Sequence, residues 1–289
     1  MPETIAVPTW EEREFQLGSL RLTLCSQGAS GGRPVLALHG WRDNAATFSA
    51  LAPLLPECRL HAPDLPGHGR SAWRPPEGDY YIWSYLEEVQ ALLNQLALER
   101  CTLLGHSMGG AIACLFAALF PERVDKLILL DAVGPLTTAP ADAPGQLRRA
   151  LEQKARRKAR PRRHYRSFDE AVAARAANDL GLDAARVLGE RGIVQDEAGF
   201  RWTLDPRLGK PNPMSLSEAH VEVMLRAISC PILLVAATAY WTERRAWFEQ
   251  RVGYFQHLRH HELPGGHHQH LEHQVEPVAA LIRAFLAEG

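Results

Sequence analysis

Short apolar runs of strand length recur along the chain, and they show little polar alternation. They occupy residues 35–38, 59–62, 102–104, 126–130 and 231–236. Near-continuous apolarity is typical of strands that are buried on both faces, as in a parallel sheet. Segments of helical character lie between these runs, notably residues 81–98 and 108–120, and Pro121 ends the second. Strands that alternate with helices predict a doubly wound α/β domain.

The two ends of the chain carry further elements. Apolar and polar positions alternate in residues 13–25 on both sides of Gly18-Ser19, which predicts an antiparallel hairpin. Near the C-terminus, residues 258–263 form the last predicted strand and residues 278–286 the last predicted helix.

The middle of the chain differs from both ends. Residues 134–229 hold a Pro- and Ala-rich entry, a basic run and helical patches, with little strand character. We therefore expect a core domain made of residues 1–133 and 230–289, with residues 134–229 inserted as a helical cap. The basic run, residues 148–166, has ten Lys or Arg and one acidic residue, Glu152. Apart from Tyr165, base-stacking aromatics are not interleaved with these cations, so a solvated cap helix is favoured over a site for nucleic acid or an anionic substrate.

Composition limits the class of protein. The chain has 289 residues, of which 46% are hydrophobic and 22% charged, and its formal net charge is −1. This profile indicates a soluble globular protein without a nucleic-acid or membrane partner. Residues 1–13 contain no basic start followed by an apolar block, so we expect a cytoplasmic protein. The five cysteines form no C-x-x-C pair and are expected to be buried core residues rather than disulfides or ligands.

A G-x-S-x-G pentapeptide lies at the end of one predicted strand. Gly105 to Gly109 follow an apolar run and precede an apolar helical segment. In a nucleophile elbow the serine lies on a sharp strand-to-helix turn, and the flanking glycines allow backbones to approach closely. The pentapeptide alone is a weak signal, but its place between strand and helix favours Ser107 as a nucleophile over an ordinary loop serine.

A serine nucleophile needs a base, and thirteen histidines are available. Seven of them lie between residues 257 and 273, so a metal cluster in residues 265–270 is a rival interpretation. Position favours His267, because it follows the last predicted strand in the loop that leads to the final helix. His268 and His270 are the second and third candidates for the base.

Four motifs in this order resemble the α/β-hydrolase superfamily. They are His-Gly-Trp at 39–41, Asp-Leu-Pro-Gly-His-Gly-Arg-Ser at 64–71, Gly-His-Ser-Met-Gly at 105–109 and Gly-His at 266–267. The resemblance implies a mostly parallel eight-stranded sheet with helices on both faces, the nucleophile after the fifth strand and a helical cap after the sixth. It also implies that no cofactor and no metal are needed.

Three shorter stretches are similar to one branch of that superfamily, the kraken and serine hydrolase-like proteins. They are residues 38–44, residues 190–192 and residues 237–241.

The acid of the expected triad departs from the superfamily's usual pattern. That pattern places an Asp after the seventh strand, but residues 233–240 contain no carboxylate. Asp131 is the best substitute, because it ends the run 126–130 and lies next to the nucleophile's strand. Some superfamily members place the acid after this strand, and in others an Asp there only braces the loop. Glu243 and a weakened dyad without an acid are the alternatives.

The expected oxyanion hole consists of two backbone N–H groups, those of Trp41 and Met108. His39 and His106 are candidates for pocket or support roles. Asp64 and His68 are expected to shape a turn. Four tryptophans could line an acyl pocket or pack in the core: Trp41, Trp83, Trp202 and Trp241.

We therefore expect a serine hydrolase that cleaves a small ester or related acyl substrate through an acyl-enzyme, with Ser107, His267 and Asp131 as catalytic residues. Carbon–carbon hydrolase, thioesterase, lactonase or cofactor-free perhydrolase chemistry would use the same three residues. A ligand-binding, receptor-like protein with weak turnover is the alternative from another class. The small-molecule acyl substrate is the only partner that the sequence implies.

Overall fold

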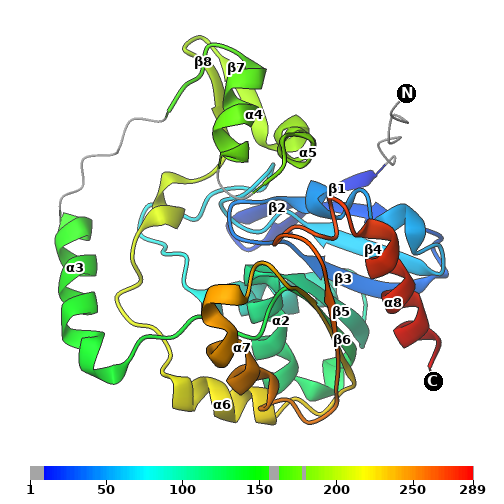
Figure 1. Cartoon of the computed structure of the whole chain (residues 1–289). Coiled ribbons are helices and arrows are strands. Elements are labelled where there is room, and N and C mark those ends of the chain that lie inside the picture. Colours follow the sequence, from blue (N-terminus) through cyan, green and yellow to red (C-terminus); the bar gives the residue numbers. More distant parts are fainter. Residues whose placement is uncertain (1–9, 156–162, 178–179, 289) are drawn as a thin grey trace.

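The computed structural model describes residues 10–155, 163–177 and 180–288, and an eight-stranded sheet runs through it (Figure 1). The strand order is β1-β2-β4-β3-β5-β6-β9-β10. The strands are β1 (Glu11–Leu17), β2 (Leu20–Gln27), β3 (Arg33–Leu38), β4 (Cys58–Pro63), β5 (Cys101–His106), β6 (Val124–Leu130), β9 (Ile232–Ala237) and β10 (Leu258–Leu263). The β1–β2 and β2–β4 pairs are antiparallel and the other pairs are parallel. The predicted mostly parallel eight-stranded sheet is confirmed.

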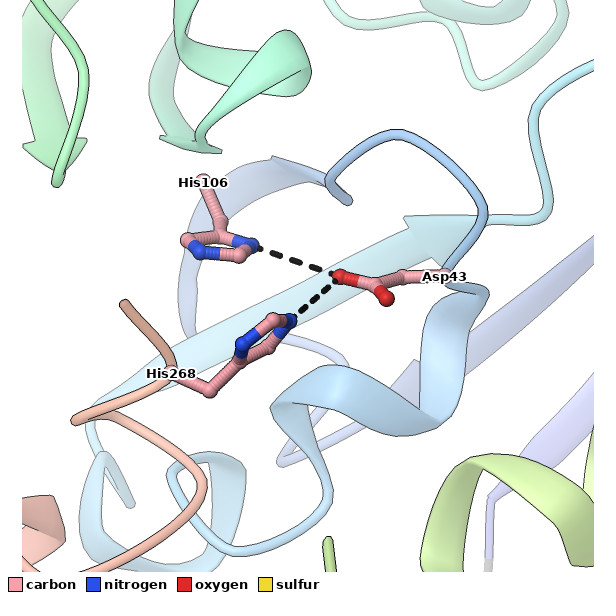
Figure 2. A group of neighbouring side chains, drawn as sticks. All are labelled: Asp43, His106 and His268. Atoms are coloured by element: carbon pink, nitrogen blue, oxygen red, sulfur yellow. Dashed lines mark hydrogen bonds and ion pairs between the residues drawn. The ribbon is translucent and has the colours of Figure 1, made fainter. Parts of the chain in front are cut away.

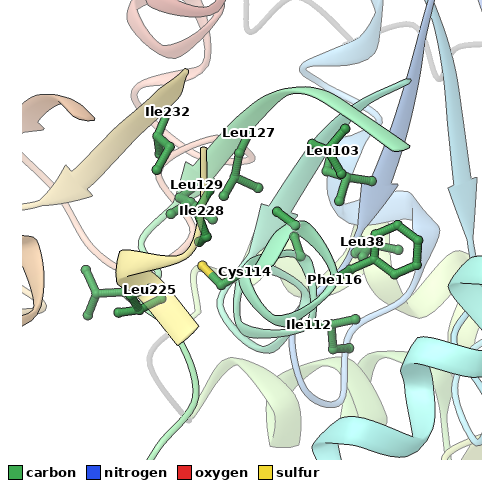
Figure 3. Packing of buried hydrophobic residues seen from close by; sticks show 14 of the residues in the cluster. Leu38, Leu103, Ile112, Cys114, Phe116, Leu127, Leu129, Leu225, Ile228 and Ile232 are labelled. Atoms are coloured by element: carbon green, nitrogen blue, oxygen red, sulfur yellow. The ribbon is translucent and has the colours of Figure 1, made fainter. Parts of the chain in front are cut away.

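Helices cover both faces of this sheet. They are α1 (Tyr85–Gln95), α2 (Met108–Leu119), α6 (Glu218–Arg226), α7 (Arg245–Val252) and α8 (Val275–Ala287). Successive strand residues point to opposite faces. Leu103, Leu127 and Leu129 therefore pack with α1, α2, α6 and α7 on one face (Figure 3), whereas Leu104 and Ile128 pack with α8 on the other. Both faces are buried, which explains why the strands show so little polar alternation.

The segment between β6 and β9 is more varied than the sequence predicted. It contains α3 (Ala143–Ala155), α4 (Phe168–Ala176) and α5 (Leu182–Gly192), and then a hairpin of β7 (Ile193–Asp196) and β8 (Gly199–Trp202). The hairpin was not predicted, because its strands have only four residues each and lack an apolar run. Helices α4 and α5 lie side by side (Figure 1), and their apolar side chains form a small buried cluster with Leu271 from the loop after β10.

Helix α6 returns the chain to the sheet. Its residues Val221 and Leu225 are fully buried in the core against α2. The division of the chain into a core and an insertion of residues 134–229 stays a prediction.

Polar contacts connect the α4–α5 region to the core. Arg191 forms an ion pair with buried Asp64 at 2.8 Å, and the side chain of Asn44 donates a hydrogen bond to the carbonyl of Leu188 at 2.9 Å. Arg175 of α4 reaches buried Asp43 at 2.8 Å. Buried ion pairs of this kind depend on good geometry and hold elements in one arrangement.

The basic run is only partly described, since residues 156–162 lie outside the described residues. At its start, Arg148 pairs with Glu152 at 2.9 Å and Lys154 pairs with Asp79 at 2.9 Å. All five cysteines are buried and free. Over the described ranges, no helix is long and apolar enough to cross a bilayer.

Candidate active site

Ser107 lies on a strained turn between β5 and α2. Its backbone has φ 51° and ψ −114°, a region that non-glycine residues rarely occupy. Such a conformation costs on the order of 1–3 kcal/mol and persists only where its surroundings hold it. The Ser107 N–H donates to the carbonyl of Leu130 at 3.1 Å, which ties the turn to β6. The turn leaves Ser107 partly exposed at the carboxyl edge of the sheet. Its backbone conformation distinguishes it from an ordinary loop serine.

Two glycines make this turn possible. A Cβ on Gly109 would lie 1.9 Å from the carbonyl oxygen of Leu38, and a Cβ on Gly105 would lie 2.5 Å from the Cα of Gly110. Both contacts are with backbone, which cannot move aside as a flexible side chain would. The spacing of the pentapeptide therefore follows from how tightly α2 packs on the ends of β3 and β5.

Asp131 and His267 form a hydrogen-bonded pair. The Nδ1 of His267 lies 2.8 Å from the Oδ2 of Asp131. The carboxylate is fully buried, and the imidazole is 13% exposed. In the strand register His106 is paired with Leu130, so Ser107 and Asp131 leave neighbouring strands at the same level. The structure thus brings three distant parts of the chain to one edge of the sheet.

The exit of β9 holds the Asp131 carboxylate. The backbone N–H of Ala237 donates to Oδ1 at 2.8 Å, and the indole N–H of Trp241 donates to the same oxygen at 2.7 Å. Burial raises the pKa of Asp131 to about 7, against the lowering effect of these two hydrogen bonds. The end of β9 and the segment after it, which have no carboxylate of their own, therefore supply two hydrogen-bond donors to the carboxylate of Asp131 at the end of β6.

His267 is held from two further sides. The Nε2–H of buried His106 donates to the carbonyl of His267 at 2.9 Å, and their rings lie 4.7 Å apart. Burial is the main reason that the pKa of His106 is lowered to about 4, so this ring is neutral near pH 7. The ring of Tyr240 stacks on the imidazole of His267 with centroids 3.9 Å apart and planes at 20°. Because His106 directly precedes Ser107, these contacts place the His267 loop beside the serine turn.

The other candidates for base and acid lie elsewhere. His268 donates from Nε2 to Asp43 at 3.1 Å, and His270 bonds Thr47 at 2.9 Å. Both rings are buried. Glu243 is exposed in the short helix Thr242–Arg244. Of the three candidate bases, His267 is the one that bonds Asp131.

The two expected oxyanion donors flank the serine turn. Met108 is the first residue of α2, and the first N–H groups of a helix have no intrahelical acceptor. Trp41 follows β3, whose terminal carbonyl lies against Gly109. The loop that carries Trp41 is braced by His39, which is fully buried and bonds the carbonyl of Gly40 at 2.7 Å.

Residues 64–71 form a polar turn beside this loop. The Nε2 of His39 accepts from the N–H of Leu65 at 2.9 Å. Asp64 accepts from the N–H groups of Ala45 and Arg70 at 2.8 and 2.7 Å. His68 bonds the carbonyl of Pro66 at 3.0 Å. Asp64 and His68 therefore shape backbone rather than face Ser107.

The four tryptophans have different surroundings. Trp41 and Trp83 are 48% and 38% exposed. Trp202 packs against the α4–α5 core and donates to the carbonyl of Ala171. Trp241 is buried and bonds Asp131. Sequence reasoning missed the part played by Trp241 and Tyr240, although both lie in residues 237–241, a stretch that already marked the family branch.

One other group of described side chains has the composition of a metal site. Asp43, His106 and His268 each offer a ligand atom, and these atoms lie within 4.8 Å of one another. Of residues 265–270, which the sequence offered as a rival metal cluster, only His268 belongs to this group.

Comparisons with known proteins identify the family of this chain. A family model described as alpha/beta hydrolase fold matches residues 33–215. A serine hydrolase-like protein of Danio rerio is 32% identical over 278 residues, which cover 90% of this chain and 83% of that protein. Serine hydrolase-like protein 2 of Homo sapiens is 31% identical over 280 residues, covering 90% and 88%.

A solved structure is similar over nearly the whole chain. It is a hypothetical protein from Pseudomonas aeruginosa PAO1, 37% identical, with a TM-score of 0.92 and coverage of 96% of this chain and 100% of that one.

Proposed function

The chain belongs to the α/β-hydrolase superfamily, in its serine hydrolase-like branch, and on this premise we propose that it cleaves small esters through an acyl-enzyme formed on Ser107. The proposed catalytic residues are Ser107, His267 and Asp131, and the proposed oxyanion donors are the N–H groups of Trp41 and Met108.

The hydrogen bond between Asp131 and His267 sets which ring nitrogen acts as the base. Asp131 accepts at Oδ2, so the neutral imidazole carries its hydrogen on Nδ1. The lone pair of Nε2 is then available to accept the proton of the Ser107 hydroxyl. The Asp131 carboxylate also stabilises the imidazolium that forms.

The proposed reaction consists of two successive acyl transfers, first to Ser107 and then to water. Ser107 Oγ attacks the ester carbonyl, and the oxyanion accepts hydrogen bonds from the Trp41 and Met108 amides. When the C–O bond breaks, imidazolium His267 gives its proton to the leaving alcohol. Water then attacks the acyl-enzyme, with His267 again taking the proton, and releases the carboxylic acid and Ser107.

The observation that carries this proposal is the 2.8 Å contact between Asp131 and His267 beside the strained Ser107 turn. Burying the Asp131 carboxylate costs free energy, and two hydrogen-bond donors hold it in place. Neither a Ser–His dyad without an acid nor a receptor-like protein would need this arrangement. The position of the acid after β6 rather than after β9 changes which strand supplies it but not its contact with the base.

Exposed aromatic side chains support a small apolar acyl group. Trp41 is 48% exposed at the oxyanion loop, and Tyr240 is 40% exposed while its ring stacks on His267. An apolar acyl chain that covers these surfaces gains roughly 25 cal/mol for each Å² removed from water.

Two assays test the proposal. The parent protein is expected to hydrolyse p-nitrophenyl acetate and to be labelled by a fluorophosphonate probe at Ser107, whereas folded Ser107→Ala does neither. Parallel assays with a thioester and a lactone distinguish the bond types that the same residues could cleave. Folded parent protein that resists the probe and turns over none of these substrates would reject the proposal.

A further inference from the structure

Three buried side chains meet beneath the proposed catalytic residues and take no part in the mechanism above. His106 and His268 converge on the same carboxylate oxygen of Asp43 (Figure 2). The His268 Nε2 lies 3.1 Å from Asp43 Oδ2, and the His106 Nδ1 lies 3.5 Å from it. At most 5% of each residue is exposed.

Protein hydrogen bonds leave His106 unsatisfied. Its Nε2–H donates to the carbonyl of His267, so in the neutral ring Nδ1 carries only a lone pair. This lone pair faces the Asp43 carboxylate, and Nδ1 has no hydrogen-bond partner. The opposite tautomer would turn the lone pair of Nε2 toward the His267 carbonyl instead. Neither neutral form satisfies both ends of the ring, whereas a cation at Nδ1 would.

Two of the three separations in this group suit a transition metal, and all three ligand atoms lie within 4.8 Å of one another. Tetrahedral zinc has ligand bonds of about 2.0–2.2 Å, which place neighbouring ligand atoms roughly 3.3 Å apart. The two separations from Asp43 Oδ2, 3.1 and 3.5 Å, lie on either side of that value. We propose that Asp43, His106 and His268 form a binding site for a divalent transition metal of the zinc type.

The surroundings of the group support this site. The Nε2–H of His106 already bonds a backbone carbonyl, as the second ring nitrogen of a metal-bound histidine usually does. Arg175 bonds the other carboxylate oxygen, Oδ1, which leaves Oδ2 directed at the imidazoles. A Cβ on Gly40 would lie 2.8 Å from both His106 Nδ1 and Asp43 Oδ2, so the absence of a side chain keeps that approach open.

Two features limit the affinity. The positive charge of Arg175 opposes a dication, and the Nδ1 of His268 has no hydrogen-bond partner. Metal binding must also displace the His268 Nε2 proton that now bonds Asp43. We therefore expect weaker binding than at a structural zinc site, and slow entry because the group is buried.

Two residues of the metal site are adjacent in sequence to the proposed nucleophile and base, so metal binding is expected to affect catalysis. This consequence rests on the proposed function. His106 directly precedes Ser107, and His268 directly follows His267. Drawing both imidazoles onto one ion shifts the two loops that align the nucleophile and the base. Bound metal is therefore expected to inhibit ester hydrolysis reversibly, with inhibition that develops over time and is undone by a chelator.

A cobalt titration tests binding without using activity. One equivalent of Co²⁺ added to the parent protein is expected to give the visible absorption of tetrahedral cobalt, and one equivalent of Zn²⁺ to remove it. In His268→Gln the side-chain amide keeps a donor for Asp43 but loses the ring lone pair, so Co²⁺ binding weakens by at least about ten-fold. His273→Gln is the matched control, because His273 is an exposed histidine of the same loop.

Crystals of the parent protein grown with Zn²⁺ give a second measurement that needs no variant. Anomalous density between Asp43, His106 and His268 is the expected result. Density at His267 alone, or Co²⁺ binding that His268→Gln leaves unchanged, would overturn the site. If Co²⁺ binds at this site but the protein has no esterase activity, the proposed function and the predicted inhibition are contradicted, whereas the metal site itself stands.

Discussion

Trp241 donates its indole N–H to Asp131 at 2.7 Å. This contact joins the exit of β9 to the end of β6 and places a donor where relatives in the superfamily usually have the acid. The other carboxylate oxygen of Asp131 bonds His267 at 2.8 Å. The end of β9 and the segment after it thus orient the carboxylate through one oxygen, and the loop after β10 contacts it through the other.

Asp131→Asn is expected to lower turnover about 10³–10⁴-fold. Two N–H donors bind Oδ1 and one binds Oδ2, so the asparagine amide nitrogen turns toward His267. The imidazole must then accept at Nδ1 and carry its hydrogen on Nε2, which prevents it from taking the serine proton. Steady-state hydrolysis of p-nitrophenyl acetate checks this result. Glu243→Gln is the control, and equal losses in the two variants would contradict the assignment.

Trp241→Phe is expected to destabilise the fold by about 1–3 kcal/mol, because one hydrogen bond to a buried carboxylate is lost. The phenyl ring keeps the packing against Phe248, whose ring centroid lies 4.7 Å from that of Trp241. Losing a donor to the ionised form also raises the pKa of Asp131 further. Urea unfolding measures the first effect and a pH–rate profile the second. The exposed Trp83→Phe should change neither, and an unaltered Trp241→Phe profile would refute the role.

Activity is expected to fall as the pH drops through about 7. Burial raises the pKa of Asp131 from 3.8 to about 7, and this carboxylate is hydrogen-bonded to His267. Below this range the pair holds an extra proton and cannot accept one from Ser107. Measuring kcat/KM between about pH 5 and pH 9 tests the expectation. An acidic limb that lies near pH 4 would contradict it.

The raised pKa of Asp131 also makes the stability of the fold depend on pH, but stability falls as the pH rises whereas activity increases. Because the folded state binds the Asp131 proton more tightly than the unfolded chain, this contribution is fully present below 3.8 and is lost as the pH rises through about 7. The stability of the parent relative to folded Asp131→Asn should therefore decline across that interval in urea titrations. A constant difference would mean that Asp131 has an ordinary pKa in the folded protein.

Gly109→Ala is expected to prevent stable folding or to distort the serine turn. Its Cβ would lie 1.9 Å from the carbonyl oxygen of Leu38, so α2 and β3 must separate. Gly31→Ala is the matched control, since nothing lies within 4 Å of its added Cβ, and a change within about 0.5 kcal/mol is expected there. Thermal unfolding of the two variants compares them. Similar thermal unfolding midpoints for the two variants would show that packing does not require a glycine at position 109.

The hairpin β7–β8 shows where sequence patterns fail. Its two strands pair with each other at only four positions, and a single bridge joins Phe200 of β8 to Tyr165. Such short strands have no periodicity long enough to detect, and their pairing depends on how α4 and α5 hold the ends. In contrast, the bounds of β10 equal those of the predicted last strand, which pairs with β9 along its whole length.

The sequence by itself determined the layered fold, the strained turn at Ser107 and the loop of His267. Burial of alternate faces and the glycines of the pentapeptide leave patterns within short stretches of the chain, so they can be read along the sequence even where, as at Gly109, the contact is with a distant residue. Only the tertiary structure decided that Trp241 and Ala237 hold Asp131, and that Asp43, His106 and His268 meet beneath. These contacts join residues up to 225 positions apart, and their geometry depends on how separate loops pack, which no local pattern encodes.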